Sequence, residues 1–268
     1  MDVSIIIVNY NTLGLTRECL SSISANTHGC KYEVIVVDNA SNEDPSELTD
    51  LFPEITLIRS DKNLGFAGGN NLGIKKATGE YILLLNSDTE IIEGNDSISL
   101  CANFMEENKD VGVVSARLEY PDGSHQSAAQ RFPGAKYKLY ELLRLQKLMS
   151  SDKRGKVMLG AFFDHNSTVE SDWVWGTFFM FRRQMLDSLP DNKLNEDYFM
   201  YGEDIQWCKD FRKRGWKVMY FPEARVLHHM GGSNAAKDEY MRESNDKFLR
   251  TNYSFLHRMF IRVLNALL

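Results

Sequence analysis

The sequence predicts an α/β fold in which helices cover both faces of a mostly parallel central sheet. Three observations support this prediction: apolar runs rich in branched residues, helical stretches that separate them, and polar clusters that directly follow the runs. Parallel strands are buried on both faces, so they read as continuous apolar runs rather than as alternating patterns. The 268 residues, 43% of them hydrophobic, can form one large domain or two small ones around a substantial core.

Strands and helices alternate through the first half of the chain. The first expected helix has Leu13, Leu20 and Ile23 on one face, the spacing of a helix that packs on a sheet. The expected strands are 3–8, 32–38, 55–60, 81–85 and 111–116, and the expected helices are 13–26, roughly 67–77 and roughly 97–107.

The pattern becomes less regular after about residue 117. The stretch YPDGS at 120–124 predicts a hairpin turn, whereas 134–170 shows no pattern that assigns it to an element. The aromatic run at 172–181 is strand-like. A helix is expected over 202–215, because basic residues occupy its last turns and Gly215 follows them. A short strand is then expected to end at Pro222.

Composition excludes several classes of protein. The net charge of −6 argues against a dedicated nucleic-acid binder, which would carry an excess of Lys and Arg. The four cysteines form no C-x-x-C pair, so neither a zinc knuckle nor a disulfide framework is indicated, and a reducing cytoplasm is expected. The apolar run near the N-terminus is too short for a signal peptide or a membrane span.

Polar clusters follow four of the expected strands, at 9–11, 38–41, 61–71 and 86–88. Any one of them is adequately explained as turn residues at a strand end. The carboxyl ends of parallel strands meet at one edge of a sheet, however, and ligands bind outside that edge. Four clusters at the same edge therefore predict a binding site.

Three of these clusters suit a nucleotide ligand. Asp38 can accept the imide N–H of uracil or thymine, or it serves only as a turn residue. The glycines within 63–73 fit neither the dinucleotide nor the P-loop fingerprint, yet they let backbone amides approach a phosphate or sugar closely. Asn86-Ser87-Asp88 has one carboxylate, which suffices for a divalent cation if the ligand brings a diphosphate; a capped turn is the alternative.

Two pairs later in the chain offer further chemistry. Glu203 and Asp204 begin the expected helix, where an ionised carboxylate is either a general base or ordinary helix-start chemistry. His228 and His229 precede Gly-Gly-Ser, and a neutral imidazole there could complete a metal shell or be structural.

Together these residues resemble family 2 of the inverting glycosyltransferases, which have the GT-A fold, and within it the rhamnosyltransferase-like branch. The resemblance covers about the first 90 residues, then 172–233 and, more loosely, the C-terminal tail. It implies a Rossmann-like nucleotide-binding half and an acceptor-binding half. The residues that it assigns to the nucleotide-sugar are Val8, Asn9, Tyr10, Asp38, Asn63, Gly65, Gly69, Asn70, Asn86 and Ser87.

The resemblance also assigns the catalytic roles. Asp88 and His228, with His229 as the alternative, would hold Mg²⁺ or Mn²⁺, and Asp204 would be the base in a single displacement with inversion. The implied donor is dTDP-rhamnose or a UDP-sugar, and the implied acceptor is a glycan or lipid-linked glycan of a cell-surface polysaccharide. The acceptor side would be formed by Trp175, Gly176, Thr177 and Glu203.

The expected organisation is a nucleotide-sugar half at 1–117, an acceptor half at 118–238 and a helical tail at 239–268. From 247 to 268 the tail has no acidic residue and interleaves arginines with apolar residues. This pattern predicts a basic amphipathic helix that lies on the inner face of a membrane, packs on the catalytic domain or joins a homodimer.

Two other functions are weighed against glycosyl transfer. A sugar nucleotidyltransferase would be expected to carry an N-terminal Gly-rich loop with a basic residue, and IVNYNTLGLT at 7–16 has none. A non-catalytic carbohydrate-binding domain would explain the tryptophans but not the polar edge of the sheet.

Overall fold

The computed structural model of the chain describes residues 2–230 and 237–267, so parts of the expected segments, namely residue 1, the Gly-Gly-Ser at 231–233 and residue 268, lie outside the described residues. The strands are β1 (Val3–Asn9), β2 (Tyr32–Asp38), β3 (Thr56–Arg59), β4 (Tyr81–Asn86), β5 (Thr89–Ile91), β6 (Val111–Glu119), β7 (Ala129–Gln130), β8 (Val169–Ser171), β9 (Trp173–Val174), β10 (Phe178–Arg182) and β11 (Lys217–His228). The α-helices are α1 (Leu13–Asn26), α2 (Ser46–Leu51), α3 (Gly65–Ile74), α4 (Ser97–Glu107), α5 (Ala135–Leu142), α6 (Ser151–Met158), α7 (Glu203–Lys213), α8 (Lys237–Asn252) and α9 (Phe255–Leu267), and the 3₁₀ turns are η1 (Leu145–Leu148), η2 (Gly160–Phe162), η3 (Arg183–Ser188) and η4 (Pro190–Asn192).

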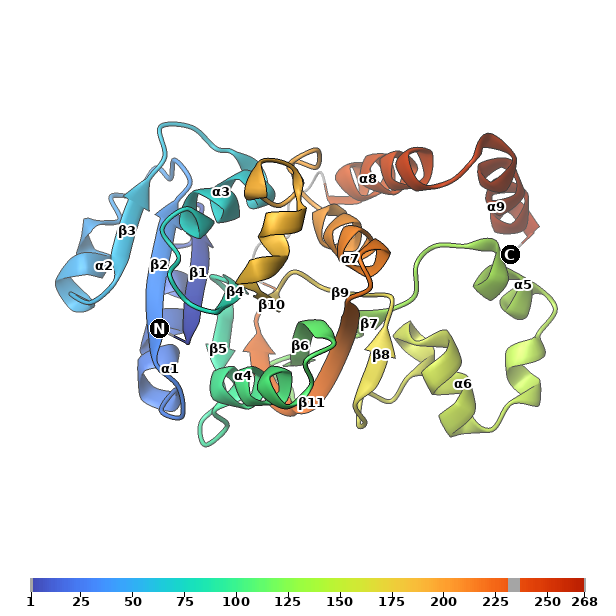
Figure 1. Cartoon of the computed structure of the whole chain (residues 1–268), viewed down its shortest axis with the longest axis horizontal. Helices are drawn as coiled ribbons and strands as arrows, with labels where there is room; N and C mark the ends of the chain where they lie inside the picture. The colour runs from blue at the N-terminus through green and yellow to red at the C-terminus, as the bar shows by residue number, and fades with distance from the viewer. Residues whose placement is uncertain (1, 231–236, 268) are drawn as a thin grey trace.

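One mixed sheet runs through the molecule in the order β3-β2-β1-β4-β10-β6-β11-β5, with β8 also paired to β11 (Figure 1). Strands β3, β2, β1 and β4 are mutually parallel, and β6 and β11 are parallel to each other. Strand β10 lies antiparallel between β4 and β6 and so joins the two halves. The predicted mostly parallel sheet is confirmed, with antiparallel insertions that the apolar pattern did not reveal.

Helices cover both faces of the sheet because its strands are apolar on both faces. Ile5 and Ile7 of β1 belong to a core that α1 and α4 share, whereas Ile6 belongs to the core under α3 and α7. This alternation follows from the two-residue period of a strand. Among the described helices, we find none with the length and apolar content needed to cross a bilayer.

Two expectations about the second half of the chain are corrected. The aromatic run at 172–181 is divided between β9 and β10, because Trp175, Gly176 and Thr177 form a turn between them. Pro222 does not end its strand: β11 continues to His228, and its register against β6 shifts between Phe221 and Arg225. A proline that cannot donate to the ladder is tolerated at such a bulge.

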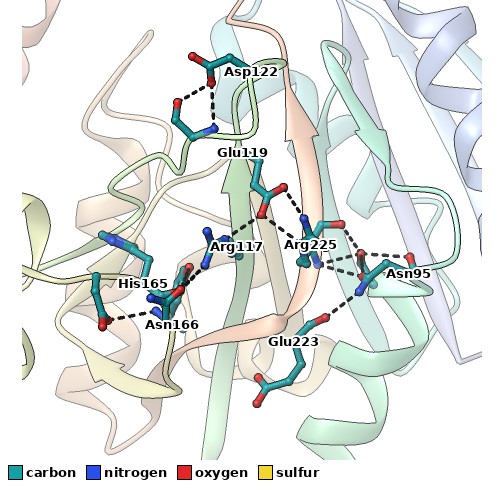
Figure 2. Close-up of polar contacts among 12 residues, drawn as sticks. Asn95, Arg117, Glu119, Asp122, His165, Asn166, Glu223 and Arg225 are labelled. Carbon is teal, nitrogen blue, oxygen red and sulfur yellow. Dashed lines mark hydrogen bonds and ion pairs between the residues drawn. The ribbon is translucent and has the colours of Figure 1, made fainter.

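Side chains satisfy the backbone groups that the bulge frees. Asn95 donates to the Glu223 carbonyl at 2.8 Å and accepts from the Arg225 N–H at 3.0 Å. The carboxylate of Glu119 lies between two guanidinium groups, accepting from Arg117 Nε at 2.8 Å and from Arg225 Nη2 at 2.9 Å (Figure 2). These contacts hold in place the last part of β11, which ends at His228.

Candidate active site

The predicted meeting of polar clusters at the carboxyl edge of the sheet is observed. Asn9 at the end of β1 donates from Nδ2 to Asp38 Oδ1 at 2.8 Å and to Ser41 Oγ at 3.1 Å. The other carboxylate oxygen of Asp38 accepts from the Ser41 N–H at 3.2 Å. A carboxylate has about four acceptor positions, so these contacts orient Asp38 and leave it able to accept from a ligand.

Asn39, which sequence reasoning missed, connects the second cluster to the third. Its Nδ2 donates to Asn63 Oδ1 at 3.0 Å and to the Gly65 carbonyl at 3.1 Å, and its Oδ1 accepts from the Leu64 N–H at 2.9 Å. Its only signal in the sequence was its place directly after Asp38 at a strand end. The glycine-containing loop is therefore held against the end of β2.

Two glycines of this loop allow close approaches. Gly65 has φ +72°, and a Cβ there would lie 2.3 Å from the Phe199 carbonyl oxygen, so this position requires glycine. A Cβ on Gly69 would lie 3.0 Å from Val8, which brings α3 against β1. The loop before α7 thus touches the start of α3.

The other residues assigned to the nucleotide-sugar differ in exposure. Tyr10 is exposed, whereas Asn70 is buried and donates to the Phe66 carbonyl of its own helix at 2.9 Å. The Ser87 hydroxyl pairs with the Thr12 hydroxyl at 2.9 Å, which ties the fourth cluster to the start of α1. The Asn86 N–H donates to the Thr177 carbonyl at 3.0 Å and links β4 to the turn before β10.

Asp88 and His228 face one another. His228 Nε2 lies 3.4 Å from Asp88 Oδ1, and both side chains are largely buried. His229 turns elsewhere, with its Nε2 2.5 Å from Glu90 Oε1. The His229 N–H donates to the Asp88 carbonyl at 2.9 Å, but of the two imidazole rings it is that of His228 that faces the Asp88 carboxylate.

The described part of the chain contains no group of three or more His, Cys, Asp or Glu side chains that could hold a metal ion by itself. The pair of Asp88 and His228 could supply two ligands. Hard divalent cations commonly complete their shell with water and substrate phosphates, so a two-residue site requires a ligand that brings its own oxygens.

Asp204 lies at the start of α7 and is oriented by two backbone amides. Its Oδ2 accepts from the Gly176 N–H at 3.0 Å and its Oδ1 accepts from the Ile205 N–H at 2.8 Å. Burial raises the pKa of Asp204 above its ordinary value. A Cβ on Gly176 would lie 3.1 Å from the Phe66 ring, so little room exists beside the carboxylate for a larger residue.

Glu203 is more deeply buried than its neighbour. Burial first, and then the charge of Asp204, raise the pKa of Glu203. Its Oε2 has no hydrogen-bond partner among the described residues. Of the pair, Asp204 is therefore the carboxyl group that holds a negative charge more readily.

The turn at 175–177 links the two acidic centres. The Thr177 carbonyl accepts from the Asn86 N–H at 3.0 Å, two residues before Asp88, and the Gly176 N–H donates to Asp204 Oδ2 at 3.0 Å. Burial first, and then the charges of Glu203 and Asp88, raise the pKa of Tyr201. Asp88, His228, Glu203 and Asp204 therefore belong to one region, next to the edge where the polar clusters meet. Trp175, by contrast, packs partly into the core.

Comparison with known proteins gives consistent results. A relative from Rickettsia felis, described as an uncharacterized glycosyltransferase, is 40% identical over 108 residues, which are 40% of this chain and 17% of that protein. The N-acetylglucosaminyl-diphospho-decaprenol L-rhamnosyltransferase of Mycobacterium tuberculosis is 23% identical over 256 residues, covering 85% of this chain and 76% of the relative. The chain thus matches only about a sixth of the length of the Rickettsia felis relative.

Solved structures confirm the predicted GT-A fold. The structure of S. aureus TarS 1–349 in complex with UDP matches 94% of this chain and 74% of its own, with a TM-score of 0.57 and 17% sequence identity. Residues 4–189 match the family described as Glycosyl transferase family 2, which is well over half of the chain. The chain therefore belongs to glycosyl transferase family 2.

Proposed function

We propose that the chain is a metal-dependent inverting glycosyltransferase that moves a sugar from a nucleoside-diphosphate sugar to a hydroxyl of a glycan or lipid-linked glycan. The observation that carries this proposal is the pairing of Asp88 with His228 at the edge of the sheet where four polar clusters meet, with Asp204 linked to the same edge through the turn at 175–177.

The geometry of Asp88 and His228 suits Mg²⁺ or Mn²⁺. Neighbouring ligands of an ion with bonds of about 2.1 Å lie about 3 Å apart, and Asp88 Oδ1 and His228 Nε2 are 3.4 Å apart. When bound, the ion supplies positive charge that neutralises the leaving diphosphate. Asp88 and His228 would hold it, and Asn86 and Ser87 would contact the nucleotide.

Asp204 is the proposed base. The amides of Gly176 and Ile205 hold its carboxylate, and Glu203, with its raised pKa, stays protonated while Asp204 is ionised. Asp204 takes the proton of the acceptor hydroxyl as that oxygen bonds to the anomeric carbon. The bond from the anomeric carbon to the diphosphate breaks on the opposite face, which inverts the configuration.

The proposed donor is dTDP-rhamnose or a UDP-sugar. Asp38 can accept the imide N–H of thymine or uracil equally well, so this residue does not separate the two. The Mycobacterium tuberculosis relative is named a rhamnosyltransferase and the TarS structure holds UDP. The same relative is named for a diphospho-decaprenol substrate, which supports a lipid-linked acceptor in cell-surface polysaccharide synthesis.

The test is release of a nucleoside diphosphate from a panel of nucleotide-sugars with Mn²⁺, with and without EDTA. We expect slow hydrolysis of one donor class that EDTA stops and added Mn²⁺ restores. Pyrophosphate formed from a nucleoside triphosphate and a sugar phosphate would instead indicate a nucleotidyltransferase. Sugar binding with no turnover of any donor would indicate a carbohydrate-binding domain.

A further inference from the structure

Helix α9 lies away from the central sheet (Figure 1). It follows α8 after a break at 253–254 and packs on α5 and α8, and its Ile261 and Leu264 are buried. Figure 1 shows α5, α6 and α9 together at the end of the molecule opposite β3 and α2. One face of α9 is therefore already covered by protein.

The other face of α9 is apolar and exposed. Leu256 is 78% exposed, and Leu148 of the neighbouring η1 turn is 84% exposed. Exposed apolar residues grouped on one helix mark an interaction site rather than ordinary surface. The set on α9 comprises Phe255, Leu256, Met259, Phe260, Val263 and Leu267.

The same end of the molecule is positively charged, although the chain carries a net charge of −6. Residues 134–158 contain seven Lys or Arg and two acidic residues. Helix α9 has no acidic residue, and of its two arginines Arg262 pairs with Asp246 of α8 at 3.1 Å. An anionic surface would complement this charge. Two copies of the same surface would repel one another, which disfavours a dimer through this face.

We propose that α9, together with the adjacent α5–η1–α6 region, binds the surface of an anionic membrane. The apolar face of α9 enters the interface, and the basic residues of the α5–η1–α6 region contact lipid phosphates. The biological role of this binding rests on the proposed function, because membrane binding would bring the active site to a lipid-linked acceptor. The binding itself does not require catalysis.

The test is co-sedimentation with vesicles of phosphatidylcholine alone and of phosphatidylcholine with about a third phosphatidylglycerol. We expect binding to the anionic vesicles only. The double variant Leu256→Glu/Phe260→Glu should bind them at least about tenfold more weakly, because it places charges on the embedded face. The matched control is Leu51→Glu, an exposed apolar residue of α2 at the opposite end of the molecule, which should bind normally.

Two outcomes would overturn the proposal: no binding of the unmodified chain to anionic vesicles, or equal binding by the double variant. A dimer in solution that the double variant dissociates would show that a second copy covers α9. Donor hydrolysis without vesicles should be unchanged in the double variant. Donor hydrolysis therefore tests the glycosyltransferase proposal, and vesicle binding tests the membrane proposal, so failure of one is distinguished from failure of the other.

A second observation, independent of α9, concerns Gln126. This residue is buried after the 120–124 turn and contacts His228 twice. Its Nε2 donates to the His228 carbonyl at 3.0 Å, and its Oε1 lies 2.7 Å from His228 Nδ1. Only the amide nitrogen can donate to a carbonyl, so the amide oxygen must face the ring.

This arrangement determines the tautomer of His228. An amide oxygen only accepts, so Nδ1 must carry the hydrogen, and the lone pair of neutral imidazole is then on Nε2. Nε2 is the atom that faces Asp88 at 3.4 Å. We infer that Gln126 is a positioning residue that presents the His228 Nε2 lone pair to a divalent cation held with Asp88.

Two variants separate positioning from simple support of the strand. Gln126→Met and Gln126→Glu both lose the donor to the His228 carbonyl, but Gln126→Glu keeps an oxygen that accepts from Nδ1. The His228 tautomer is read by ¹⁵N NMR of the metal-free protein at mildly alkaline pH, with the signal assigned from a His228→Asn variant. Mn²⁺ affinity is measured by electron paramagnetic resonance.

We expect the hydrogen on Nδ1 in the unmodified chain and in Gln126→Glu. In Gln126→Met we expect it to move to Nε2, with Mn²⁺ bound about tenfold more weakly. Equal weakening in both variants with an unchanged tautomer would reduce Gln126 to a structural role. A hydrogen on Nε2 in the unmodified chain would overturn the inference, whereas absence of any Mn²⁺ binding would count against the metal site itself.

Discussion

Asp88 and Asn86 stand two residues apart but differ in what surrounds them. Asp88 faces His228, whereas the backbone of Asn86 is tied to the turn before β10. We predict that Asp88→Ala abolishes metal-dependent transfer by weakening Mn²⁺ binding. Asn86→Ala should keep Mn²⁺ affinity and mainly raise the KM for the nucleotide-sugar. Equal loss of Mn²⁺ affinity in the two variants would contradict this division of roles.

The raised pKa of Asp204 predicts the acid side of the pH–rate profile. Burial raises this pKa above the ordinary value of 3.8, and the base works only when ionised. Activity should therefore fall as the pH decreases through the raised pKa, well above pH 4. The test is to measure the rate of sugar transfer from donor to acceptor at a series of mildly acidic pH values. An activity that stays constant down to about pH 4 would remove Asp204 from the role of base.

Stability should change with pH in the opposite direction. A carboxyl group whose pKa is higher in the folded than in the unfolded state stabilises the fold at low pH, and this stabilisation is lost as the pH rises through the raised pKa. Glu203 is such a group, because burial and Asp204 raise its pKa. Glu203→Gln should lessen the decline in Tm between mildly acidic and alkaline pH. A decline identical to that of the unmodified chain would show that Glu203 does not cause it.

At the scale of the element, the bulge in β11 determines where His228 lies. The Glu119 carboxylate contacts Arg117 and Arg225, and its side chain is 6% exposed. Glu119→Ala leaves both guanidinium groups without this partner and should cost about 2 kcal/mol of unfolding free energy. Because β11 ends at His228, Mn²⁺ affinity should fall as well. Denaturant unfolding and Mn²⁺ titration measure the two effects.

The control for this prediction is Glu223→Gln in the same bulge. Glu223 is exposed, and a change of its charge should alter the unfolding free energy by less than about 0.5 kcal/mol. A similar cost in both variants would mean that net charge near the bulge, rather than the Glu119 contacts, stabilises it.

Elements with a strong apolar pattern were predictable from the sequence, and others were not. The strands and helices of the first half follow continuous apolar runs and helical spacing, and the meeting of their polar ends follows from parallel pairing. By contrast, α5 spans only eight residues, too few for helical spacing to be distinctive, and none of them is buried. The continuation of β11 past Pro222 depends on Asn95, more than a hundred residues earlier.

The same reasoning explains which site residues were missed. Asn39 and Gln126 are recognised only by their partners, which lie 24 and 102 residues away in the sequence. A lone Asn or Gln carries no pattern of its own. Asp88, Asp204 and His228 were found because their neighbours resemble a known family, and their roles remain predictions.

At the scale of the whole molecule, the two C-terminal helices do different things. Phe248 of α8 is buried with Tyr198 and Ile205, in the region that leads into and begins α7. The Ser244 hydroxyl of α8 also contacts the Met200 carbonyl at 3.4 Å. Thus α8 packs beside the proposed base, whereas α9 presents its apolar face outward.

Two phenylalanines in these helices allow the difference to be tested. Phe248→Ala removes a fully buried ring and should cost about 3 kcal/mol or more of unfolding free energy. It should also slow transfer, because the loop before Glu203 loses its support, while vesicle binding below the Tm is unchanged.

Phe255, 65% exposed on α9, is the matched control. Phe255→Ala should leave Tm and donor hydrolysis unchanged and weaken vesicle binding. If each variant lowered both the transfer rate and vesicle binding, α8 and α9 would act as one unit. Neither the support of the base nor the membrane contact could then be assigned to one helix alone.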